Sequence, residues 1–186
     1  MEKNKTIIIG ESGSGKSYKA IKMAIENKGT TIITSGCTKR SIYEDFYPEL
    51  KDFVLKECCV PFKIEDGKKY FIESDKTLNK DTLSKECVTL ANSVIFGSSW
   101  GDLSNDENAM VIFDDGAWDC RDDRLFLLEC FNQIKCQIVI TVQDWDSILG
   151  LNAQDAAIAR KPNIFSGMQN DILGSWIIEN ISKERS

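Results

Sequence analysis

The most informative stretch of the sequence is Gly10-Glu11-Ser12-Gly13-Ser14-Gly15-Lys16-Ser17. It follows the apolar run Ile7-Ile8-Ile9 and precedes a segment with helical spacing of apolar residues that ends near Asn27. Glycine allows backbone conformations with positive φ, so successive N–H groups in such a stretch can point toward one anion. A helix that begins near Gly15 adds the positive end of its dipole. The stretch therefore predicts a strand, an anion-binding turn and a helix, in that order.

The same stretch matches the pattern GxxxxGK[ST], which defines the P-loop of nucleotide-binding proteins. In such a loop the Lys16 ammonium would contact the β- and γ-phosphates, and the Ser17 hydroxyl would coordinate Mg²⁺. We therefore expect all eight residues to bind a nucleotide, with ATP and Mg²⁺ as the ligands. The Tyr18 ring, next in sequence, is a candidate for stacking on an adenine, and packing against the sheet is its alternative.

A second motif is Val111-Ile112-Phe113-Asp114-Asp115, an apolar run that ends in two acids. An acidic residue at the end of a buried strand beside the P-loop strand fits the Walker B role of holding Mg²⁺. We expect Asp114 to be the acid that holds Mg²⁺, and we call it the metal-side acid. Asp115 would then orient or deprotonate the attacking water, and a capping carboxylate in the next loop is its alternative.

A third polar strand end follows the run Gln137–Val142. Gln143 at this end could reach the γ-phosphate or the attacking water, and a strand end that simply becomes polar is the alternative. Thr141 lies two residues earlier, and strand alternation points it to the face that Gln143 uses.

Ring-shaped hydrolases often insert an arginine into a neighbour's site to stabilise transition-state charge. The candidates here are Arg121, Arg124 and Arg160, and a solvated arginine is the alternative for each. The basic pairs Lys39-Arg40 and Lys68-Lys69 would contact nucleic-acid phosphates if they lined a channel, and ordinary surface charge is their alternative.

Length and composition restrict the function classes. The 186 residues predict one domain over residues 1–186, and 42% hydrophobic residues are enough for a core. The net charge of −6 argues against a basic nucleic-acid coat but permits a local basic groove.

The chain has no histidine, which excludes Ser–His, Cys–His and histidine general-base chemistry. Seven cysteines without a CxxC pair favour reduced thiols. No apolar run approaches the ~18 residues of a membrane span, so we expect a cytoplasmic protein.

Strand and helix patterns alternate along most of the chain, and the strands are continuous Ile/Val runs that suit strands covered on both faces. We therefore predict an α/β fold with a mainly parallel central sheet and helices on both sides. The dipeptide Asp66-Gly67 favours a hairpin turn, which predicts a small β-hairpin insertion over residues 53–74. Residues 97–108 are expected to form a polar loop. Helices are expected at residues 77–96 and 152–160, and strands at residues 69–73, 110–113, 137–142 and 163–166.

The order of these motifs resembles the additional-strand class of P-loop ATPases, which includes RecA-like motors. The FtsK–HerA superfamily, and within it the small genome-packaging ATPases of viruses and phages, is similar in three stretches: Ile112-Phe113-Asp114-Asp115, residues 138–143, and Arg160-Lys161-Pro162-Asn163. The resemblance implies a three-layer P-loop NTPase fold. It also implies that ATP hydrolysis drives double-stranded DNA through a homo-oligomeric ring into a capsid, with a capsid or portal protein as partner, in the cytoplasm of a host cell.

Two other functions use the same loop. One is a nucleotide-switched phage assembly protein that does not translocate DNA, although such proteins usually carry a membrane span. The other is a nucleoside or nucleotide kinase, which needs an acceptor pocket and usually an arginine-rich lid. The sequence contains no arginine cluster.

Overall fold

The computed structural model of the protein describes residues 4–35, 38–57, 62–73, 101–114, 118, 124–149 and 171–183. Within these residues, seven strands form one sheet in the order β3-β4-β2-β5-β6-β1-β7, and all neighbouring pairs run parallel. The strands are β1 (Lys5–Ile9), β2 (Thr31–Thr34), β3 (Val54–Glu57), β4 (Lys69–Glu73), β5 (Met110–Phe113), β6 (Gln137–Val142) and β7 (Ile177–Asn180). The predicted parallel α/β sheet is confirmed.

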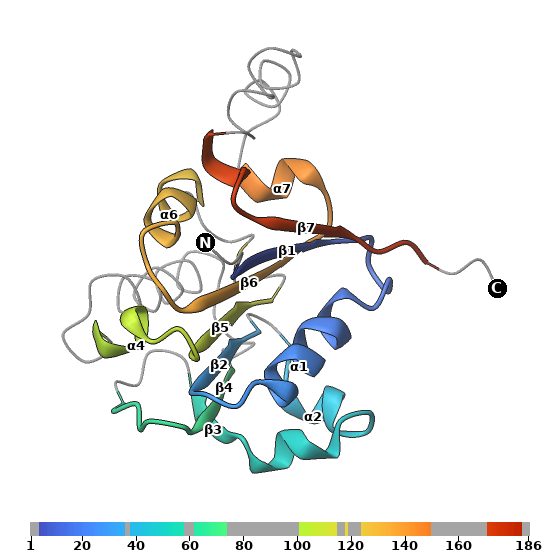
Figure 1. The fold of residues 1–186 in the computed structure, drawn as a ribbon. Coiled ribbons are helices and arrows are strands. Elements are labelled where there is room, and N and C mark those ends of the chain that lie inside the picture. The colour runs from blue at the N-terminus through green and yellow to red at the C-terminus, as the bar shows by residue number, and fades with distance from the viewer. Residues whose placement is uncertain are drawn as a thin grey trace.

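Helices cover both faces of this sheet (Figure 1). The helices in the described part of the chain include α1 (Lys16–Glu26), α2 (Arg40–Glu44), α4 (Gly101–Asn105), α6 (Arg124–Phe131) and α7 (Trp145–Leu149), with a 3₁₀ turn η1 at Pro48–Asp52. α1, α2 and η1 pack on one face, and α4, α6 and α7 pack on the other. Within the described residues, no helix is both long enough and apolar enough to cross a membrane.

The sheet separates two apolar cores. Ile7 and Ile9 of β1 point into the core that contains residues of α4, α6 and α7, and Ile8 points into the core that contains residues of α1 and α2. These isoleucines are 0–6% exposed, and burying one such side chain contributes about 1.5–3 kcal/mol. Because both sides of each central strand are covered, polar alternation is absent and the strands form continuous apolar runs.

The predicted hairpin at residues 53–74 is wrong, because β3 and β4 pair in parallel. The Asp66-Gly67 turn does form, with φ of 72° at Gly67, but it leads into β4 without joining two antiparallel strands. Thr30 explains the difference, since its hydroxyl accepts the Gly67 N–H at 2.8 Å and holds the turn at the start of β2. β4 therefore starts beside β2 and runs in the same direction, as an interior strand.

Two short helices also differ from the expectation. α4 lies within residues 97–108, which were expected to be a loop, because Leu103 is buried in the core and the Ser104 carbonyl accepts two N–H groups that precede β6. α7 had no predicted counterpart. The Asp144 carboxylate caps its first turn by accepting the N–H and the hydroxyl of Ser147, at 2.9 and 3.0 Å. The expected helices at 77–96 and 152–160 and the expected strand at 163–166 lie outside the described residues.

A methyl group at Gly29 should destabilise the fold, because a Cβ there would lie 2.6 Å from the carbonyl carbon of Asn108. We expect Gly29→Ala to lower the free energy of unfolding by about 1–3 kcal/mol, as overpacking does. Urea denaturation measures this change. Lys28→Ala, at the exposed neighbouring position, is the control and should change the value by less than about 0.5 kcal/mol. An unchanged Gly29→Ala variant would contradict the close approach of these two segments.

Candidate functional site

The carboxyl ends of the parallel strands meet at one edge of the sheet, where three of the predicted motifs lie. The loop at residues 10–15 follows β1, Asp114 follows β5 and Gln143 follows β6. The expectation that β5 lies beside β1 is wrong, because β6 pairs with both strands and separates them. β1 and β6 are neighbours whose following helices, α1 and α7, pack on opposite faces of the sheet. Open α/β sheets bind ligands in the crevice that such a divergence creates.

The loop after β1 has a backbone that glycine adopts most readily. The φ angles are 76° at Gly13 and 91° at Gly15, in the left-handed region that side chains disfavour. Gly10 is restricted by space, since a Cβ there would lie 2.8 Å from the carbonyl oxygen of Ile181. The Gly10 N–H donates to the carbonyl of Val142 at 3.0 Å. The loop is therefore held between β6 on one side and the segment after β7 on the other.

Two polar side chains are buried where this loop enters α1. Lys16, the first residue of α1, is 3% exposed. The Ser14 hydroxyl oxygen is buried and has no hydrogen-bond partner among the described residues. A buried hydroxyl without a partner costs about 1–3 kcal/mol, so a ligand oxygen at this point would remove a penalty. A phosphate group fits this set of an ammonium, a hydroxyl and the N–H groups at the start of a helix.

The outer side of the loop is exposed at Glu11, Ser12 and Gly13. A Cβ on Gly13 would lie 3.4 Å from Cε and 3.7 Å from Nζ of Lys183. The segment after β7 therefore brings a second lysine beside the loop. Sequence reasoning missed Lys183, because nothing in its local sequence relates it to a loop near the other end of the chain.

Asp114 is a buried carboxylate that accepts hydrogen bonds from two hydroxyl groups. It is 2% exposed. The Thr141 hydroxyl donates to Oδ1 at 2.6 Å, and the Tyr43 hydroxyl donates to Oδ2 at 3.2 Å. A carboxylate has about four lone-pair sites, so an aspartate can accept hydrogen bonds and coordinate a cation at the same time. The predicted metal-side acid is thus buried and oriented.

The Tyr43 hydroxyl is a buried donor to the Asp114 carboxylate. Burial raises the pKa of Tyr43 to about 12, and the negative charge of Asp114 adds to the rise. Tyr43 therefore stays protonated at neutral pH and donates its proton to the carboxylate. The predicted metal-side acid is thus oriented by a residue of α2.

This arrangement suits a particular kind of metal site. No group of three His, Cys, Asp or Glu residues that could hold a metal exists in the described part of the chain. Mg²⁺ does not need such a group, because proteins usually bind it through one or two carboxylates together with substrate phosphates and water. Ser17 and Asp114 fit that pattern if a nucleotide supplies the phosphate oxygens.

Tyr18 packs among other aromatic rings. Its ring centroid lies 5.5 Å from that of Tyr43, 5.0 Å from that of Phe46 and 6.0 Å from that of Tyr47. Tyr18 therefore packs within the protein, as the alternative interpretation expected, but it packs against α2 and the turn after it and not against the sheet. A contact between Tyr18 and an adenine stays a prediction.

Gln143 is exposed directly after β6. The preceding residue, Val142, accepts the N–H of Gly10, so the backbone at Gln143 is adjacent to the start of the glycine-rich loop. A polar contact from this side chain to a phosphate or a water molecule stays a prediction.

Arg124 of α6 has a structural partner. Its guanidinium donates to the carbonyl of Ser147 at 3.1 Å and ties α6 to α7. This contact within the chain disfavours Arg124 as an arginine that reaches a neighbouring subunit. The remaining predicted site residues, Asp115, Arg121 and Arg160, lie outside the described residues.

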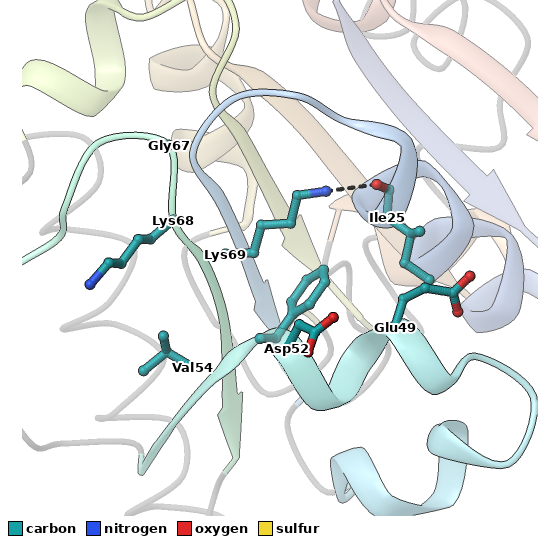
Figure 2. Close-up of a pocket in the computed structure, with 8 residues that line it drawn as sticks. Ile25, Glu49, Asp52, Val54, Gly67, Lys68 and Lys69 are labelled. Atoms are coloured by element: carbon teal, nitrogen blue, oxygen red, sulfur yellow. Dashed lines mark hydrogen bonds between the residues drawn. The ribbon is translucent and has the colours of Figure 1, made fainter.

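A cavity of about 510 Å³ lies at the opposite edge of the sheet (Figure 2). It is lined by Ile25, Glu49, Asp52, Phe53, Val54, Gly67, Lys68 and Lys69. The Lys69 ammonium donates to the carbonyls of Ala24 and Ile25 at the end of α1, at 3.0 and 2.6 Å, and burial lowers the pKa of Lys69. Lys69 therefore caps a helix, which disfavours the predicted phosphate contact of the Lys68-Lys69 pair.

Arg40 is likewise engaged within the chain. Its guanidinium donates to the Glu44 carboxylate at 2.7 Å and to the Phe53 carbonyl at 2.8 Å. The backbone N–H of Arg40 donates to the Glu73 carboxylate at 2.6 Å. These contacts hold α2 in place. Tyr43 on α2 is a site residue that sequence reasoning missed, because its acceptor Asp114 lies 71 positions away and no local pattern relates them.

No protein-family model matches this chain, and no curated protein matches it either.

Removing the Thr141 hydroxyl should destabilise the protein, because the buried Asp114 carboxylate would lose its 2.6 Å hydrogen bond. We expect Thr141→Val, which keeps the shape of the side chain, to lower the free energy of unfolding by about 1–3 kcal/mol. Urea denaturation is the measurement. Thr6→Val, at another buried strand threonine, is the matched control and should be close to neutral. Equal stabilities of the two variants would show that the hydrogen bond to Asp114 contributes nothing.

Proposed function

We propose that this protein binds ATP with Mg²⁺ at the carboxyl edge of its sheet and hydrolyses it. The observation that carries the proposal is that three groups from two strand ends lie at the same edge of the sheet: Lys16 and Ser17 follow β1, and Asp114 follows β5. Lys16 is buried at the start of α1, and Asp114 is buried and oriented by the hydroxyls of Thr141 and Tyr43. An ammonium, a hydroxyl and a carboxylate in this arrangement are the groups that phosphoryl transfer from a nucleotide requires.

We assign the fold to the additional-strand class of P-loop ATPases. β6 lies between β1, which carries the glycine-rich loop, and β5, which ends at Asp114. A strand inserted between these two is the arrangement that the name of the class describes. The positive φ angles at Gly13 and Gly15 support the same assignment, because they turn the loop into the anion-binding form.

The proposed roles follow from position and chemistry. Lys16 and the N–H groups at the start of α1 would bind the phosphates, and the Ser14 hydroxyl would donate to one of their oxygens. Ser17 and Asp114 would hold Mg²⁺, which supplies positive charge against the charge that develops on the phosphates. Asp115 would orient or deprotonate the attacking water, and Gln143 would contact the water or the γ-phosphate.

We extend the proposal to translocation of double-stranded DNA by a homo-oligomeric ring, which packages a viral or phage genome into a capsid. The support is the resemblance of three stretches to the FtsK–HerA superfamily. Arg160 is assigned to stabilise charge in the site of a neighbouring subunit. The net charge of −6 implies that DNA contacts are confined to a local basic patch inside the ring.

ATP hydrolysis should depend on Lys16. We expect Lys16→Ala to abolish Mg²⁺-dependent ATP hydrolysis, because the loop loses its buried positive charge. Released phosphate is the measurement. Lys22→Ala removes an exposed lysine from the same helix and should hydrolyse ATP like the wild type. Hydrolysis that persists in Lys16→Ala at the rate of Lys22→Ala would refute the proposed site.

Double-stranded DNA should stimulate the ATPase. We expect the rate to rise on addition of DNA at low salt and the stimulation to decline steeply as salt increases, because phosphate contacts release counterions. The matched control is Asp114→Asn, which should show no stimulated rate. Hydrolysis without any DNA stimulation would favour the assembly protein, and phosphorylation of an added nucleoside or nucleotide would favour the kinase.

A further inference from the structure

Tyr43 contacts the predicted metal-side acid, Asp114, from a separate element. It lies on α2, whereas Asp114 follows β5. Its side chain is 5% exposed, and its hydroxyl donates to Oδ2 of Asp114 at 3.2 Å. No motif in the sequence assigns a role to this residue.

The hydrogen-bond inventory of a phenol explains what this contact does. A phenolic hydroxyl has one proton to donate, and here the proton goes to Oδ2 of Asp114. The Thr141 hydroxyl donates to Oδ1 of the same carboxylate at 2.6 Å. Each carboxylate oxygen therefore has its own hydroxyl donor, and the two donors together fix the orientation of the carboxylate.

The ring of Tyr43 is held as firmly as its hydroxyl. It packs edge-on against Tyr18 with 5.5 Å between ring centroids, and tilted against Phe71 with 6.4 Å. Arg40, three residues earlier on α2, contacts the Glu73 carboxylate and the Phe53 carbonyl. The hydroxyl is therefore placed by two core rings and by an anchored helix.

We propose that Tyr43 is a positioning residue for Mg²⁺: its hydroxyl holds the Asp114 carboxylate in the orientation that the metal of a bound metal–nucleotide complex requires. The inference rests on the proposed function, since it concerns the metal of that same site. Groups that hydrogen-bond to metal ligands commonly set metal affinity, and their loss typically costs about 10–100-fold. Tyr43 acts through Asp114 and has no direct role toward the reacting phosphate.

The test separates metal affinity from nucleotide affinity. A fluorescent, non-hydrolysable ATP analogue is titrated into wild type and Tyr43→Phe, once with Mg²⁺ and once with EDTA. Phenylalanine keeps the ring contacts and removes only the hydroxyl. We expect the gain in affinity that Mg²⁺ provides to fall by about 10–100-fold in Tyr43→Phe, while the affinity in EDTA stays that of the wild type.

Two controls test whether Tyr43→Phe disturbs the fold and whether Tyr43 acts through Asp114. Tyr47→Phe removes a hydroxyl from the same aromatic cluster and should retain the full Mg²⁺ gain. In an Asp114→Asn background, Tyr43→Phe should cause a much smaller further loss, because a residue that acts through Asp114 has less left to position.

Three other outcomes would contradict the inference. An equal loss of affinity for the ATP analogue with Mg²⁺ and with EDTA would make Tyr43 a general structural residue and overturn the inference. An unchanged or larger Mg²⁺ gain in Tyr43→Phe would also overturn it, the latter by showing that the hydroxyl competes with the metal. Wild-type protein that binds no nucleotide under either condition would refute the proposed function and, with it, this inference.

Discussion

The parallel pairing of β6 with β1 on one side and with β5 on the other is the constraint on which the site depends. The register places Ile9 opposite Val142 and Phe113 opposite Ile140, so the three strands end close together at one edge of the sheet. The loop after β1, the carboxylate after β5 and the hydroxyl of Thr141 near the end of β6 converge for this reason. Two apolar cores enforce the pairing, because each central strand buries side chains on both faces. A shift in register would move these polar groups apart and place polar residues in the core.

The second organising feature is the way in which the protein keeps a carboxylate buried. A buried charge is costly unless hydrogen bonds or a counter-charge compensate it. Asp114 receives hydrogen bonds from Thr141 and Tyr43, which come from β6 and α2 on either side of its strand. These bonds orient both carboxylate oxygens before any ligand arrives, and preorganised groups lose little free energy in reorganising when a ligand binds. The price of this arrangement is sensitivity to the loss of either hydroxyl.

Sequence reasoning recovered those parts of the fold whose signal is local. β4, β5 and β6 were predicted with their observed bounds, because each is an apolar run between polar residues. The glycine-rich loop was predicted because Gly13 and Gly15 adopt conformations that other residues disfavour. The hairpin prediction failed because the Asp66-Gly67 turn is held by Thr30, which is distant in sequence. Tyr43 and Lys183 were missed for the same reason, since tertiary packing brings each of them to the site. For the described residues, local chemistry was therefore predictable and long-range partnership was not.

We propose the carboxyl edge of the sheet as the site of a metal–nucleotide complex, and a crystal structure with Mg²⁺ and a non-hydrolysable ATP analogue would test this proposal. We expect phosphate oxygens within hydrogen-bond distance of the N–H groups of residues 13–17 and of the Lys16 ammonium. We also expect a metal ion bound by the Ser17 hydroxyl and held, directly or through water, by Asp114. A nucleotide bound elsewhere, for example in the cavity beside Lys68 and Lys69 at the opposite edge of the sheet, would contradict it.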